Sequence, residues 1–224
     1  MQRQEAEEHL RVIRSLMEKA TVYRAIAAPT ALIAGLLAIG AAYVGIVRDS
    51  PLAYTAPVEL TEIQRLSFLL TWAVVLIVVA AANGWFLYAD AKRREEKFIS
   101  SGMKMALLAL LPSHLTALVL SHIFAYRPEI LATVWIILHG IGLLATSHFS
   151  PRSMINLGWA FLVAGILCVF HYTSPPHGFF AMTVHKNSVR YLSPYYVMAI
   201  TFGLFHLIYA ACTWPRKSAT HGDE

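Results

Sequence analysis

Long stretches of hydrophobic residues, separated by short polar segments, are the dominant pattern of this chain. Six of them run for about 18 to 25 residues, the length that a helix needs to cross a hydrocarbon core of about 30 Å. We therefore predict an all-α polytopic membrane protein, a bundle of six transmembrane helices that together occupy residues 25–214. The six stretches are Ile26–Val47, Leu66–Asp90, Met103–Phe124, Ile130–Ser147, Met154–Tyr172 and Tyr195–Thr213.

The first 24 residues follow a different pattern. Apolar residues such as Leu10, Ile13 and Met17 fall on one half of a helical wheel, while charged residues of both signs fall on the other half. This pattern predicts an amphipathic cytosolic helix over residues 1–24. Because its polar face mixes acidic and basic residues, we expect it to dock on protein rather than to lie on a lipid surface. Residues 215–224 are expected to form a short cytosolic tail.

Composition and charge fit this interpretation. The chain is 57% hydrophobic and 14% charged, whereas about 25% charged residues is usual for a soluble domain. If the N-terminus lies inside, 13 of the 18 lysines and arginines fall on the cytoplasmic side. We therefore expect both termini in the cytoplasm and the plasma membrane as the location, which in a bacterium is the inner membrane. The basic balance indicates contact with anionic lipid in the bilayer and gives no support for a nucleic-acid partner.

The first span is rich in small residues at spacings of three and four, including Ala27, Ala31, Gly35, Ala38 and Ala42. Such stripes let two helix backbones approach closely in lipid. The stripe predicts either packing inside the bundle or homo-oligomer formation. Together with residues 1–24, it is also the surface expected to contact a membrane or cytosolic protein partner.

Three histidines, His114, His139 and His206, lie deep inside separate spans. At a rise of 1.5 Å per residue, each is about 14 to 17 Å from one end of its span. Ionisable side chains at this depth are costly and usually face a partner, a cavity or a cofactor. They could be hydrogen-bonded structural residues or part of a proton or ion path, and the sequence leaves both interpretations open.

A cofactor is the third interpretation of these histidines. Gly142 lies three residues after His139, and Gly203 lies three residues before His206, so each imidazole has a glycine on its own helix face. A haem held between helices needs imidazole nitrogens to ligate iron and missing side chains to leave room for the ring. The spacing therefore predicts a b-type haem at His139 and His206, with His114 as an alternative ligand.

Other polar residues suggest two further sites. Imidazoles suit zinc or copper, and four histidines are expected near the outer face, either as metal ligands or as solvated interfacial residues. They are His122, His171, His177 and His185. Asn83, in the inner half of the second span, is expected to hydrogen-bond to another helix.

The sequence lacks several motifs that are typical of enzymes. The sequence has no phosphate-binding loop, no dinucleotide-binding fingerprint and no nucleophile elbow. We therefore expect a non-enzymatic subunit or regulator that acts through helix–helix contacts with a partner. The alternatives are a haem-binding electron-transfer protein and, less favoured, a proton or ion path.

Overall fold

The structure is a computed structural model that describes residues 28–48, 53–54, 61–93, 95, 101–148, 150–173, 184–185, 188–189 and 191–214. Six helical segments in these ranges are long and apolar enough to cross a membrane, which confirms the six predicted spans. The predicted amphipathic helix over residues 1–24 and the tail over 215–224 lie outside the described residues. The helices are the first helix (Ala28–Arg48), α2 (Glu62–Arg93), α3 (Ser101–Ile123), α4 (Pro128–Ala145), α5 (Arg152–Thr173) and the segment Pro194–Thr213.

The last of these segments changes its backbone pattern along its length. It starts as the α-helix α6 (Pro194–Met198), continues as the π-helix η1 (Ala199–Phe205) and ends as the α-helix α7 (His206–Thr213). A π-helix bonds residue i to residue i+5 and occurs mostly as a single wide turn, often at functional sites. The change back to α-helix occurs at His206, one of the three deep histidines.

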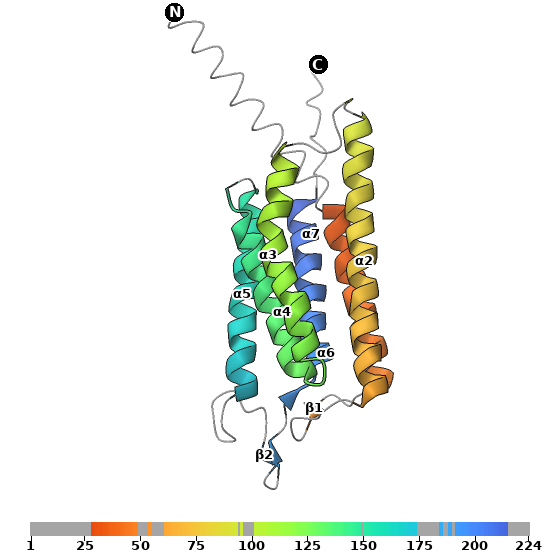
Figure 1. Ribbon diagram of the computed structural model, residues 1–224, viewed down its shortest axis with the longest axis vertical. Coiled ribbons are helices and arrows are strands. Elements are labelled where there is room, and N and C mark those ends of the chain that lie inside the picture. The colour runs from red at the N-terminus through yellow and green to blue at the C-terminus, as the bar shows by residue number, and fades with distance from the viewer. Residues whose placement is uncertain are drawn as a thin grey trace, which may run out of the picture.

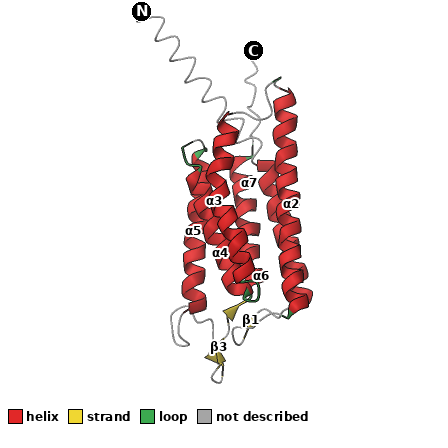
Figure 2. Ribbon diagram, viewed as in Figure 1, coloured by secondary structure: helices red, strands yellow, loops and turns green. Residues whose placement is uncertain are grey.

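Helix α4 lies at the centre of the bundle and packs along α5 and α3, as Figures 1 and 2 show. Half of its hydrophobic stretch is buried inside the bundle, which is the largest share among the six segments. Leu131 and Ile136 of α4, together with Phe161 of α5, are fully buried in the shared core. The centre of the bundle is therefore formed where α4 meets α5.

The small residues of the first helix face inward. Ala28, Ala31, Ala34, Ala38 and Ala42 are all buried. Two of the three glycines in this helix serve close approach, because a Cβ built on Gly35 would lie 2.7 Å from the Leu207 side chain, and one on Gly45 would overlap the ring of Tyr195. The third, Gly40, has nothing within 4 Å of its Cβ position. The small-residue stripe is thus used for packing within the chain.

Short strands lie at one end of the bundle, the lower end in Figure 1. Strand β1 (Ala53–Tyr54) pairs antiparallel with β4 (Tyr191–Leu192), and β2 (Val184–His185) pairs with β3 (Ser188–Val189). The β1–β4 pair links the segment before α2 to the segment before α6. It therefore ties two distant parts of the chain together at one end of the bundle.

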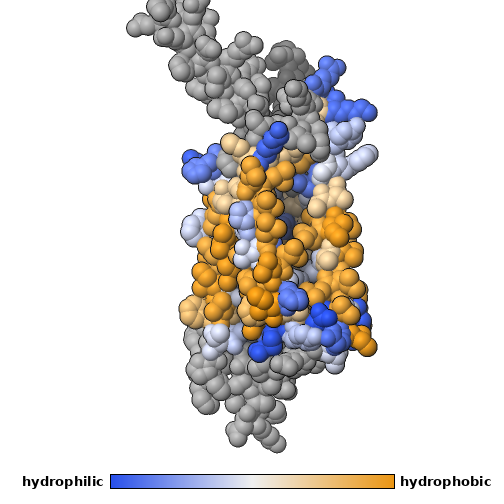
Figure 3. All heavy atoms as spheres, in the orientation of Figure 1, coloured by the Kyte–Doolittle hydropathy of each residue, from blue (hydrophilic) through white to orange (hydrophobic). Residues whose placement is uncertain are grey.

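The surface has the distribution expected of a membrane protein. Hydrophobic side chains cover the middle of the visible face, and hydrophilic ones gather toward its two ends (Figure 3). Large apolar residues such as Leu118 of α3 and Ile77 of α2 are more than half exposed. In water, apolar exposure on this scale would be unfavourable, whereas lipid accepts it.

A turn follows the second span. In the structure α2 ends at Arg93, and Glu95 adopts a left-handed backbone with φ of 57°. Its N–H bonds to the carbonyl of Lys92, which closes a turn. Gly102 lies inside the first turn of α3.

Candidate functional site

The three deep histidines meet in the interior of the bundle. The ring centroids of His139 on α4 and His114 on α3 are 5.9 Å apart, and those of His139 and His206 on α7 are also 5.9 Å apart. His139 is the middle member, and three separate helices supply the rings. We call His114, His139 and His206 the histidine centre. Depth along each helix suggested a shared level, and the structure adds that the side chains face one another.

Two of the three imidazoles are oriented by their own helices. Nδ1 of His114 lies 2.9 Å from the carbonyl oxygen of Leu110, and Nδ1 of His206 lies 2.9 Å from that of Phe202. A carbonyl oxygen only accepts hydrogen bonds, so Nδ1 donates in both rings. In the neutral state each Nε2 is therefore a bare acceptor. In both cases the partner is the backbone carbonyl of the residue four positions earlier on the same helix.

His139 has no such partner. Its Nε2 is buried and makes no hydrogen bond among the described residues. Its ring is instead surrounded by aromatic side chains, with centroids 4.7 Å from Phe161 on α5 and 5.2 Å from Phe202 on η1. Phe161 also packs against His206 at 5.5 Å. The histidine centre is thus enclosed by two phenylalanine rings and has one unsatisfied nitrogen in its middle.

The packing around the two glycines does not leave room for a haem. A Cβ on Gly142 would lie 2.5 Å from Oγ of Ser113, and a Cβ on Gly203 would lie 2.6 Å from Ile39. Both spaces are filled by neighbouring helices, α3 and the first helix. Phe161 and Phe202 contact His139 closely, where a macrocycle would need to enter. The tautomers of His114 and His206 suit metal ligation through Nε2. The described residues nevertheless leave no space for the haem macrocycle. Haem binding stays a prediction.

The outer histidines do not form a metal site within the described residues, where no group of three or more His, Cys, Asp or Glu side chains could hold an ion. His122 is exposed on α3. Nε2 of His171 accepts a hydrogen bond of 2.9 Å from the N–H of Leu192, and this bond ties the end of α5 to β4. His177 and the side chain of His185 lie outside the described residues, so the four-histidine site stays a prediction.

Helix α2 is held to the bundle near its N-terminal end. Only Phe68 and Trp72 of its 32 residues are buried. Phe68 stacks on Trp135 of α4 with centroids 5.8 Å apart and meets the edge of Tyr195 at 5.3 Å. These aromatic contacts form the main described anchor of α2.

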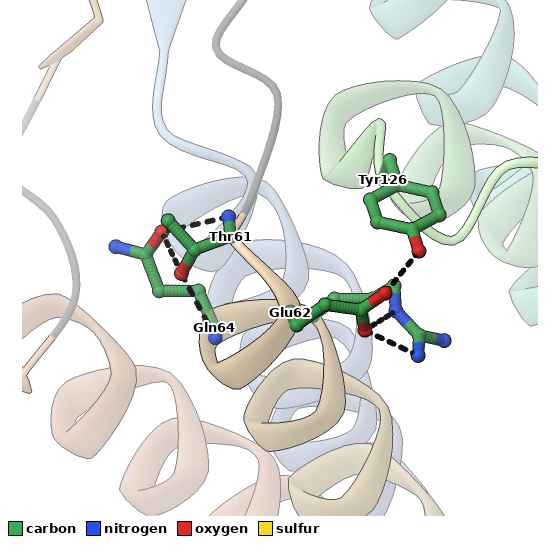
Figure 4. A network of polar contacts seen from close by, with 5 residues as sticks. Thr61, Glu62, Gln64 and Tyr126 are labelled. Atoms are coloured by element: carbon green, nitrogen blue, oxygen red, sulfur yellow. Dashed lines mark hydrogen bonds and ion pairs between the residues drawn. The ribbon is translucent and has the colours of Figure 1, made fainter.

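Polar contacts at the start of α2 add to this anchor, as Figure 4 shows. Thr61 and Gln64 form a capping box, with the Gln64 side chain accepting from the N–H of Thr61 at 3.1 Å. Glu62 forms an ion pair with Arg65 at 2.6 Å and accepts a hydrogen bond from the hydroxyl of Tyr126 in the α3–α4 turn. This bond to the Glu62 carboxylate raises the pKa of Tyr126. The start of α2 is therefore joined to the neighbouring turn.

The inner half of α2 carries the amide anticipated from the sequence. Oδ1 of Asn83 accepts a hydrogen bond from the hydroxyl of Thr30 on the first helix at 3.4 Å, which confirms a contact between helices. Asn83 is nevertheless exposed. Gly84 beside it has nothing within 4 Å of the position that a Cβ would occupy, so this part of α2 has open space beside it.

The sequence interpretation missed the two phenylalanines that enclose the histidine centre. Phe202 lies four residues before His206, a spacing that places both on one helix face, and this was a usable signal. Phe161 comes from another span, and nothing local in the sequence links it to the histidines.

Comparisons with protein-family models, with curated proteins and with solved structures find no match to this chain.

Proposed function

We propose that this chain is a non-enzymatic integral membrane protein, a subunit or regulator that acts through contact between α2 and a transmembrane helix of a partner protein. One observation carries the proposal: α2 exposes an amide side chain, Asn83, at a depth where lipid supplies no hydrogen-bond partner. Exposed apolar side chains are satisfied by lipid, but an exposed amide is not.

The depth of Asn83 follows from helix geometry. It lies nine residues from Lys92 in the basic last turn of α2, or about 14 Å along the helix. A hydrocarbon core is about 30 Å thick, and basic residues mark its edge, so Asn83 lies inside it. We propose that the Lys92 end of α2 faces the cytoplasm, because lysines and arginines are concentrated on that side of the six spans.

The hydrogen bonding of Asn83 is incomplete within the described residues. Its single contact, 3.4 Å from the Thr30 hydroxyl, is longer than the usual 2.5 to 3.0 Å of an O–H···O hydrogen bond. That contact uses the carbonyl oxygen, and the NH₂ group has no acceptor among the described residues. Amide side chains commonly hydrogen-bond between transmembrane helices, at a worth of about 1 kcal/mol.

The surroundings of Asn83 suit a second helix. Ala80 is exposed, and Gly84, four residues later, has open space beside it. Small residues four apart let two backbones come close enough for an amide to reach across. We call Ala80, Asn83 and Gly84 the α2 contact face. The occupant proposed for it is a transmembrane helix that presents a carbonyl, hydroxyl or carboxyl acceptor.

Site-specific photocrosslinking in native membranes tests this proposal. A photoreactive residue at Ala80 should give a discrete crosslinked product, and Asn83→Leu should reduce that product severalfold, because the amide bond is lost at similar side-chain size. The same group at Val163, an exposed position on α5, is the matched control and should give only diffuse products. Equal products at Ala80 with and without the amide would contradict the proposal. A crosslinked product that contains two copies of this chain would show that the partner helix belongs to a second copy in a homo-oligomer and not to a different protein.

A further inference from the structure

The histidine centre has properties that a purely structural cluster does not need. We infer that it binds one proton, which is shared between His139 and a neighbouring imidazole, so that the interior of the bundle changes from neutral to singly positive. This inference concerns the interior and does not depend on the α2 contact face. It rests on the hydrogen bonding, the aromatic surroundings and the spacing of the three rings.

The hydrogen bonding supplies acceptors on both sides of His139. Nδ1 of His114 and Nδ1 of His206 are committed to backbone carbonyls of their own helices. The other nitrogen of each ring, Nε2, therefore has a lone pair directed away from that carbonyl. His139, with a buried and unpartnered Nε2, lies between them. A hydronium ion can transfer a proton to one of these nitrogens and leave as water, so that one O–H bond breaks and one N–H bond forms. The proton is then shared with a neighbouring ring through an N–H···N hydrogen bond.

The aromatic surroundings can stabilise a positive charge. The centroid of Phe161 is 4.7 Å from that of His139 and 5.5 Å from that of His206. Phe202 is 5.2 Å from His139. These separations are within about 6 Å, the range in which a cation that lies over the face of an aromatic ring is attracted to it. The rings thus partly replace the water that a charged imidazole loses on burial.

The groups facing His139 explain why the site takes one proton only. His114 faces it from α3 and His206 from α7, while α5 and η1 contribute the phenylalanines. Within the described spans, acidic and basic side chains occur only toward the ends, so no carboxylate compensates a second charge. A second imidazolium about 6 Å from the first would repel it in a medium of low dielectric constant. The three rings are expected to titrate as one coupled unit.

Nitrogen NMR of ¹⁵N-histidine-labelled full-length protein in lipid nanodiscs tests the inference, with each signal assigned by single substitution. At high pH, His114 and His206 should show the Nδ1–H tautomer. As the pH falls from about 8 to about 4, one imidazolium equivalent should appear across the three rings. This range extends below the usual histidine range of about 5 to 8, because burial disfavours the charged form. His139→Gln should abolish this shared signal, and His122→Gln, at an exposed position on α3, should leave it unchanged.

Several outcomes would overturn the inference. Three rings that stay neutral over this range, or that titrate independently with one proton each, would show that no shared proton site exists. Stoichiometric metal or haem in the purified protein would show that the nitrogens serve another ligand. If His139→Gln does not fold, the double variant His114→Gln/His206→Gln removes the acceptors on both sides of His139 and must also abolish the sharing. An unchanged signal in that variant would equally overturn the inference.

Discussion

At the scale of single residues, glycines decide how closely the helices approach the histidine centre. Gly142 allows Ser113 to lie against α4, and Ser113 is adjacent to His114. Oγ of Ser113 donates to the carbonyl of Leu110, the same carbonyl that accepts from Nδ1 of His114. The glycine identified from the sequence as space for a cofactor is therefore a packing residue that positions a histidine.

Gly142→Ala should consequently destabilise the protein and disturb His114. The added Cβ would lie 2.5 Å from Oγ of Ser113, and overpacking of this kind costs about 1 to 3 kcal/mol. Thermal unfolding in detergent measures the effect. Gly40→Ala is the matched control, because Gly40 has nothing within 4 Å of its Cβ position and alanine favours a helix. Equal stability of the two variants would show that the contact with Ser113 is not restrictive.

At the scale of elements, the π-helix η1 is the feature that distinguishes the last span from the other five. Its wide turn contains one residue more than an α-helical turn and ends at His206. Phe202 and Gly203 both lie in it, one against His139 and the other against the first helix. The π-helix thus connects the histidine centre to the packing of the first helix.

A single-residue deletion tests whether η1 holds one extra residue. Deleting Ile200, an exposed position in η1, should restore α-helical geometry while leaving the flanking faces in place, because the wide turn absorbs the change. Deleting Ile141, an exposed position in α4, should instead rotate one part of that helix relative to the other by about 100°. Monodispersity in size-exclusion chromatography and the temperature of unfolding compare the two. A loss of folded protein as severe for Ile200 as for Ile141 would refute this account of η1.

At the scale of the whole molecule, hydrophobic length predicted the architecture closely. The observed spans end within a few residues of the predicted ones, because lipid requires every backbone group in a span to be bonded inside the helix. The exception is α2, which starts at Glu62, four residues before the predicted Leu66. The polar capping box formed by Thr61 and Gln64 extends the start of α2. A prediction based on the length of hydrophobic stretches does not include such polar residues.

The histidine centre was predictable only in part. Depth followed from counting residues along each span, so His114, His139 and His206 could be placed at one level. The direction of each ring could not be predicted, because it depends on the rotation of one helix against another and on the wide turn of η1. The role of Gly142 and Gly203 was ambiguous for the same reason, since a missing side chain admits either a cofactor or a neighbouring helix.

We propose, as the central point, that the histidine centre is packed without a haem, and that the protein acts through its helices rather than through a bound redox group. The visible absorption spectrum of protein purified after expression with ample haem tests it most directly. The account predicts no Soret band in the wild-type protein, because the spaces beside Gly142 and Gly203 are filled by Ser113 and Ile39. A Soret band in the wild type that disappears in both His139→Ala and His206→Ala would contradict it.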